Sequence, residues 1–209
     1  CITHKDILDY SSGDSFKTVE GRFNKIRYIA SSEQSYELIA NAISKKPAFN
    51  AFYLKNKELF QGLIDVASVV NVFDEMATES FEKKVVEGCF PLAPLSAFAL
   101  LRVSELVGQN ERTLFTFLAK NDPHSLLEFM ICERPTADCV TIDLIYDYFQ
   151  DLLRKEIFNT AIHSVWAKTD TALRQVNSTS EKEILKAIAI ISMIQDERFK
   201  AIPSHIKAA

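Results

Sequence analysis

Glycine is scarce in this chain, with only five in 209 residues, at positions 13, 21, 62, 88 and 108. Phosphate-binding loops of the GxxxxGK-Ser/Thr and GxGxxG kinds need several closely spaced glycines, because the backbone itself must approach the phosphate. No stretch of the sequence satisfies either pattern. The sequence therefore predicts that this chain alone does not bind a nucleotide in the P-loop manner.

Metal-ligand and nucleophile patterns are also missing. The cysteines form no CxxC pair, and the histidines do not fall near them at zinc-ligand spacing, so we predict no metal site. In a reducing compartment such cysteines are usually small buried apolar residues. No Gly-x-Ser-x-Gly elbow occurs, which argues against autonomous acyl-transfer catalysis. The residues concerned are Cys1, Cys89, Cys132, Cys139, His4, His124, His163 and His205.

Long apolar runs and concentrated positive charge are absent as well. No uninterrupted apolar stretch approaches the roughly 20 residues that cross a bilayer, and the N-terminus lacks the order of a signal peptide. The net charge is -4 and the basic residues are scattered, which argues against a dedicated nucleic-acid surface. We expect a cytoplasmic chain with no membrane contact. Because it opens on Cys1-Ile2-Thr3-His4 without a methionine, we interpret it as part of a longer protein.

The apolar residues that are present recur mostly at helical spacing. This pattern predicts a mainly α fold, an irregular helical bundle, with at most one or two short strands near the N-terminus, of which 23–29 is the clearest. No period of 20 to 50 residues repeats, so a solenoid is not expected. In the first half of the chain we expect a helix after Ser31-Ser32, a helix over 78–87 ended by Gly88, and a central apolar helix over 95–107. Between the first two we expect one long helix from Asn50, whose apolar face comprises Leu59, Leu63, Val66, Val70 and Phe73.

In the second half we expect three helices. The first is capped by Thr141, and its inner face comprises Ile142, Ile145, Tyr146, Phe149 and Leu153; the second has a face of Ile162, Trp166, Thr169, Leu173 and Val176; and the third begins with a capping box of Ser180 and Glu183.

Two acidic patterns imitate catalytic motifs. The run 69–75, which ends in Asp74-Glu75, resembles the apolar strand and acidic pair of a Walker B motif. Its surroundings have helical period, so we interpret it as a solvated helix end. Asp143 and Asp147 share a helical face on the side away from Ile142, and an exposed charged face explains them.

A polar run between two apolar segments is harder to explain. It comprises Gln109-Asn110-Glu111-Arg112-Thr113. An arginine among apolar stretches is rarely buried without a partner. Arg112 therefore lies at the surface, pairs with Glu111 or Glu105, or contacts a phosphate or a partner, since guanidinium forms forked bonds to such groups.

The segments 88–95 (GCFPLAPL) and 109–118 (QNERTLFTFL) resemble large bacterial ATP-binding proteins of the P-loop, AAA-like class. The stretches 1–6, 19–23 and 141–149 resemble further elements of the same family. This resemblance implies an internal fragment downstream of Walker A and Walker B. Residues 1–30 would end a nucleotide-binding domain, 31–140 would form a lid-like helical domain, and 141–209 a second helical subdomain, whose start also matches a composition shift near residues 137–140.

The same resemblance suggests roles for four residues. Thr3 or His4 would stand at the sensor-1 position, and Arg22 or Arg112 would sense the γ-phosphate or bridge protomers. The intact parent would hydrolyse ATP with Mg²⁺, whereas the fragment alone would bind neither and would not be catalytic. Its partner would be the upstream nucleotide-binding domain of the same polypeptide, together with a protein or DNA partner of the parent.

Two other functions stay open at this point. One is a helical protein-interaction module with no nucleotide role, in which Arg112 only ties a turn between two core helices. The other is a nucleic-acid-binding fragment that uses Lys45, Lys46, Lys55 and Lys57.

Overall fold

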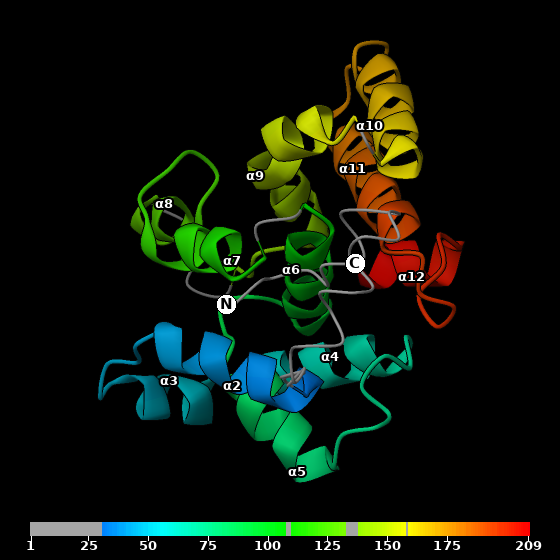
Figure 1. Cartoon of the computed structure of the whole chain (residues 1–209). Helices are drawn as coiled ribbons and strands as arrows, with labels where there is room; N and C mark the ends of the chain where they lie inside the picture. The colour runs from blue at the N-terminus through cyan, green and yellow to red at the C-terminus, as the bar shows by residue number, and fades with distance from the viewer. Residues whose placement is uncertain (1–30, 108–109, 133–137, 158) are drawn as a thin grey trace, which may run out of the picture. The chain divides into compact units, whose positions relative to one another are not determined.

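The computed structural model describes residues 31–107, 110–132, 138–157 and 159–209, without the side chains of 110–112. Within these ranges the chain forms eleven α-helices and one π-helix and no strand, which confirms the mainly α helical bundle (Figure 1). The predicted strand at 23–29 lies outside the described residues. The helices are α2 Ser32–Ala42, α3 Phe49–Lys55, α4 Lys57–Ser68, α5 Thr78–Ser80, the π-helix η2 Phe81–Glu87, α6 Pro94–Leu106, α7 Asn110–Ala119, α8 Leu126–Ile131, α9 Ile142–Lys155, α10 Thr160–Leu173, α11 Thr179–Ile194 and α12 Pro203–Ala208.

Helix α6 occupies the centre of the packing, as its apolar sequence predicts. Pro94 opens the helix, where a missing backbone N–H costs nothing. Ten of its thirteen residues are buried, because η2, α4, α7, α9 and α11 all pack against it. Leu92, just before α6, forms an isolated parallel bridge with Val140, in which Val140 N–H donates to Pro91 O at 2.8 Å and Ala93 N–H donates to Val140 O at 3.1 Å.

Helices α9, α10 and α11 pack against one another, with α10 and α11 side by side in Figure 1. The predicted inner face of α9 is confirmed: its five residues are all fully buried. Those residues are Ile142, Ile145, Tyr146, Phe149 and Leu153. Strong amphipathic periodicity decides the orientation of such a helix, because one face alone is apolar.

Residues 32–209 form one compact unit with a single buried cluster. This cluster includes Leu92 and Leu100 on one side of residue 140 and Ile145 and Ile190 on the other. Buried residues on both sides of residue 140 belong to this cluster, and the expected subdomain boundary there stays a prediction. None of the described helices is long and apolar enough to cross a lipid bilayer.

The long helix expected from Asn50 is wrong. The segment is divided into α3 and α4 at Asn56, which leaves the helical conformation with φ -113° and ψ 34° and whose side-chain amide donates to Phe52 O at 2.8 Å. Phe60 and Ala67 are the buried residues of α4, while Val66 is 41% exposed. The different face is selected because α4 packs against η2 and α6.

Two helix ends also differ from expectation. Helix α11 begins at Thr179 after Ser178, so Ser180 is already helical and its capping box with Glu183 does not form. The segment 78–87 is helical as predicted, but most of it is the π-helix η2. Gly88 follows with φ -65°, which is an ordinary helical conformation, so no unusual backbone angle requires glycine here. The requirement is steric, because an added Cβ would lie 2.8 Å from the Ala40 Cβ.

Candidate functional site

The structure locates one of the four predicted nucleotide-sensing residues. Arg112 lies in the first turn of helix α7, and its side chain is outside the described atoms. Thr3, His4 and Arg22 all lie outside the described residues. The four are therefore not brought together by any observed geometry, and their roles stay predictions.

The start of α7 is anchored firmly in the core. Thr113 is 7% exposed, and Leu114, Phe117 and Leu118 are buried where α7 packs against α6. The interaction-module alternative places Arg112 in a turn between two core helices, but residues 110–113 are helical. The reason is that the apolar residues after Arg112 follow helical spacing, so packing extends the helix back through the polar residues.

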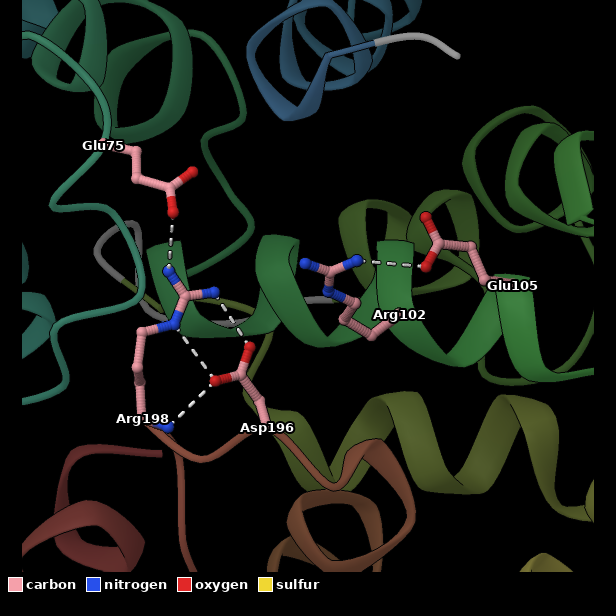
Figure 2. A network of polar contacts seen from close by, with 5 residues as sticks. All are labelled: Glu75, Arg102, Glu105, Asp196 and Arg198. Atoms are coloured by element: carbon pink, nitrogen blue, oxygen red, sulfur yellow. Dashed lines mark hydrogen bonds and ion pairs between the residues drawn. The ribbon is translucent and has the colours of Figure 1, made fainter. Parts of the chain in front are cut away.

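A second arginine-bearing arrangement lies on α6 and was not predicted. Arg102 donates from Nη1 to Glu105 Oε2 at 3.2 Å, one turn along the helix (Figure 2). Its guanidinium carbon lies 5.4 Å from the centre of the Phe98 ring, a cation–π distance. The i, i+3 spacing of arginine and glutamate was a readable signal for this pair.

Arg198, after the end of α11, makes the most complete ion pair in the described structure. Its Nε and Nη2 donate to the two oxygens of Asp196 at 3.1 and 2.9 Å, and its backbone N–H donates to the same carboxylate at 2.9 Å. Nη1 also lies 3.7 Å from Glu75 Oε1 (Figure 2). The bonds to Asp196 fix the turn after α11, and the contact with Glu75 reaches the segment between α4 and α5.

Electrostatics in this cluster favour the charged forms. The Arg198 guanidinium lowers the pKa of Asp196, and Arg102 lowers it further through charge alone. The Asp196 side chain raises the pKa of Arg198 in return. Both arginines therefore have carboxylate partners already, so the arrangement suits a structural clamp better than an anion-binding site.

Glu75 belongs to the run 69–75 that imitates a Walker B motif. That run follows the end of α4 as irregular backbone, and Asp74 and Glu75 are exposed, as expected of a solvated helix end. Glu75 is 89% exposed, so its contact with Arg198 is screened by water and contributes little.

The expectation of an exposed charged face on α9 is wrong for Asp147. Its carboxylate accepts from Lys186 Nζ of α11 at 2.7 Å, and the two side chains are only 18% and 19% exposed. Asp143 instead accepts from the hydroxyl of Thr141. Asp147 faces inward because α11 packs across α9 and brings Lys186 to it.

The described metal-ligating side chains do not cluster, and the described cysteines differ in burial. Among the described residues, no cluster of three or more His, Cys, Asp or Glu side chains could hold a metal ion. Cys89 is fully buried, as predicted, and burial raises the pKa of its thiol to about 12. Burial also raises the pKa of Cys139 to about 11, whereas Cys132 is exposed, contrary to the expectation of a buried thiol.

The described surface includes depressions of different sizes. One, of about 30 Å³, lies between α7, α8 and α9, beside Phe117 and Ser125, and is about the size of one water molecule. The other is an open depression of about 440 Å³ beside Gln195 and Lys200. Comparison of the chain with known protein families, curated proteins and solved structures finds no match.

Proposed function

We propose that this chain is a lid-like helical extension of a larger cytoplasmic ATP-binding protein, in which the start of α7 meets a negatively charged group. The observation that carries the proposal is the position of Arg112 in the first turn of a helix whose next residues are buried. The backbone of residue 112 is therefore joined directly to a helical segment that is buried in the core. The resemblance of residues 88–95 and 109–118 to P-loop ATPases supplies the identity of the anion, the γ-phosphate of ATP.

Helix electrostatics support an anion at this place. The first backbone N–H groups of a helix have no partner within the helix, and the helix dipole makes this end positive. A basic residue in the first turn is therefore unfavourable by about 0.3–1 kcal/mol unless an anion lies nearby. A phosphate would be attracted by both the N–H groups and the guanidinium.

In this proposal ATP and Mg²⁺ are held by the nucleotide-binding domain upstream, and this chain supplies a sensing element. Thr3, His4 and Arg22 would belong to the end of that domain, with Thr3 or His4 at the sensor-1 position. Movement of α7 would pass to α6, against which it packs, and from there to α9 and α11. Such coupling would let the nucleotide state act on a protein or DNA partner.

The second candidate is a helical protein-interaction module. It is favoured by two adjacent apolar side chains at the end of α8, since Met130 is 56% exposed and Ile131 is 69% exposed. In this function Arg112 has no role in nucleotide chemistry.

Substitution of Arg112 in the full-length parent separates the two functions. We expect Arg112→Ala to lower ATP turnover on the order of 10³-fold, as removal of an arginine finger does, with circular dichroism unchanged. Arg112→Lys should restore little, because lysine lacks the forked geometry. Arg154→Ala is the control, since Arg154 is 56% exposed on α9. Unchanged turnover in Arg112→Ala would remove Arg112 from the mechanism and support the interaction module.

Calorimetry on the isolated chain provides an independent check. Because the sequence holds no glycine-rich phosphate loop, we expect no measurable binding of ATP even when the nucleotide is in large excess. Saturable binding would contradict the assignment of the nucleotide site to an upstream domain.

A further inference from the structure

Positive charge is concentrated around helix α3. Residues 38–57, which run from α2 to the start of α4, contain four lysines and no aspartate or glutamate, so this stretch carries a charge of +4. The whole chain, in contrast, has a net charge of -4. The four are Lys45, Lys46, Lys55 and Lys57, the candidates for nucleic-acid binding in the sequence.

Three of these lysines are exposed at the two ends of α3. Lys46 precedes the helix, Lys55 is its last residue and Lys57 begins α4. At 1.5 Å per residue the seven-residue helix is about 10 Å long, so the charges bracket a short surface. Within the described ranges no carboxylate forms an ion pair with any of the three, whereas Lys84 and Lys186 have carboxylate partners. Their charges are therefore available to an anionic partner.

Aromatic rings lie on one side of α3, which has no buried residue and lies at the edge of the helical bundle (Figure 1). Four of the rings form what we term the phenylalanine cluster, in which Phe90 lies 6.0, 5.6 and 5.2 Å from the ring centres of Phe49, Phe52 and Phe60. Tyr53 adds a fifth ring, whose centre lies 4.6 Å from that of Phe60. Phe60 is buried, whereas the other four rings are partly exposed. Solvent therefore reaches an aromatic surface between the lysines.

Lys45 is fixed against this aromatic surface. Its Nζ lies 4.9 Å from the centre of the Phe49 ring and 6.0 Å from that of Phe90, and it donates a hydrogen bond to the Phe90 carbonyl oxygen. Ring faces and a carbonyl oxygen both attract the ammonium form. Burial lowers the pKa of Lys45 to about 8, so the group is still mostly charged at about pH 7. Lys45 thus adds positive charge at the same end of α3 as Lys46.

This surface suits a single-stranded nucleic acid. Unpaired lysines attract phosphate groups, and partly exposed aromatic rings are surfaces on which free bases stack. In a duplex the bases are already stacked on one another, so the rings would add nothing. An anionic membrane fits less well, because the outward side of α3 carries Asn50 and Ala51, and Leu54, 62% exposed, is its one exposed large apolar side chain.

We propose that α3 and the lysines beside it bind single-stranded nucleic acid without base preference. The phosphates contact Lys46, Lys55 and Lys57, and a base stacks on the exposed part of the Tyr53 ring. Lysine is a point charge that contacts phosphate oxygens, so these contacts carry no sequence information. The proposal goes beyond the role of Arg112 and does not depend on it, because every contact lies on α3 and its flanks.

Fluorescence anisotropy of the full chain with labelled oligonucleotides tests the binding. The probes are oligodeoxythymidylate and oligouridylate of about 20 nucleotides, which is longer than the usual site on one small domain. We expect both to bind at about 50 mM salt, and the logarithm of the affinity to fall with the logarithm of the salt concentration with a slope of about -2, the value for three phosphate contacts on a single strand. Tighter binding of one probe identifies DNA or RNA as the partner.

Competition separates the single strand from other anions. An unlabelled duplex of the same length should displace the probe at least about fivefold less well, since it offers no free bases for stacking. Vesicles of phosphatidylcholine and phosphatidylserine should not displace the probe. Absence of binding at about 50 mM salt, equal displacement by the duplex, or displacement by the vesicles overturns the proposal.

Two triple variants with the same change of charge test the lysines. One replaces Lys46, Lys55 and Lys57 by glutamine, and the control replaces three exposed lysines elsewhere, namely Lys120, Lys155 and Lys168. The first should bind the probes more than about tenfold more weakly and lose most of the salt dependence, whereas the control should keep both. An equal loss in the two variants would show only attraction to the chain as a whole and overturns the proposal.

Substitution of Tyr53 tests the stacking. Tyr53→Leu should weaken single-strand binding at least about fivefold without changing the salt slope, because the lost contact involves a base and no phosphate. Tyr53→Phe keeps a ring and should bind as the wild type does. The melting temperature of each variant shows whether it is folded. If folded Tyr53→Leu binds as tightly as the wild type, no base stacks on this ring and the proposal fails.

Discussion

Arg198 and Asp196 form a three-bond clamp in the turn after α11, with two guanidinium–carboxylate bonds at 3.1 and 2.9 Å and a backbone N–H bond at 2.9 Å. The Asp196 side chain is only 13% exposed, so water screens the pair less than an ordinary surface ion pair. This clamp fixes the turn beside Phe199, which is buried against Phe98 of α6.

Removal of the clamp should destabilise the fold. We expect Asp196→Ala to lower the free energy of unfolding by about 1–2 kcal/mol, because the Arg198 guanidinium and backbone N–H lose a charged acceptor. Urea unfolding followed by circular dichroism measures the change. Glu197→Ala is the control, since Glu197 is 89% exposed and, among the described residues, pairs only with Lys200. Equal effects of the two substitutions would show that the clamp adds no stability.

The same carboxylate should make stability depend on pH in the acid range. The pKa of Asp196 is lowered in the folded state by Arg198, whereas an unfolded aspartate titrates near about 3.9. A lowered folded pKa stabilises the protein fully above the unfolded value, and this stabilisation is lost as the pH falls through the folded value. Between about pH 6 and about pH 3 the urea midpoint of the wild type should fall more steeply than that of Asp196→Asn. If the urea midpoints of the two proteins fell in parallel with pH, Asp196 would not be the source of the acid dependence.

The partly buried pair of Asp147 and Lys186 gives a different expectation. In the wild type the Lys186 side chain is only 19% exposed. Asp147→Ala leaves this ammonium without its partner, which should lower the free energy of unfolding by about 2 kcal/mol. The double variant Asp147→Leu with Lys186→Met should be more stable than Asp147→Ala, because no charge is left unpaired. Arg154→Ala is the control, because its partner Asp151 is 76% exposed. A double variant less stable than Asp147→Ala would show that the ion pair itself stabilises the fold.

The sequence predicts some helices well and others poorly, for identifiable reasons. Helix α9 has one strongly apolar face, so its periodicity predicts its orientation, whereas α6 is apolar nearly all round, so its composition predicts its central position. The break at Asn56 is a change of backbone conformation at one residue, which the period of the apolar residues does not register.

The candidate site is less accessible to sequence reasoning than the fold. The i, i+3 pair of Arg102 and Glu105 can be read from spacing, but the inward position of Asp147 depends on α11 packing across α9. The environment of Lys45 likewise depends on Phe90, 45 residues away along the chain. Such contacts are tertiary, and a single sequence contains no direct signal for them.

Two glycines in helical conformation should respond in opposite ways to the same substitution. At Gly88 an added Cβ would lie 2.4 Å from the Lys84 carbonyl oxygen and 2.8 Å from the Ala40 Cβ, so backbone or α2 must move. We expect Gly88→Ala to lower the free energy of unfolding by about 1–3 kcal/mol, the usual effect of overpacking.

Gly62, inside α4, meets no atom within 4 Å of an added Cβ. Gly62→Ala should therefore raise the free energy of unfolding by about 0.5–1 kcal/mol, because alanine loses less backbone entropy in a helix. Thermal and urea unfolding of both variants measure the contrast. If Gly88→Ala were also stabilising, the close approach of η2 to α2 at Gly88 would be wrong, since helix propensity alone would then explain both results.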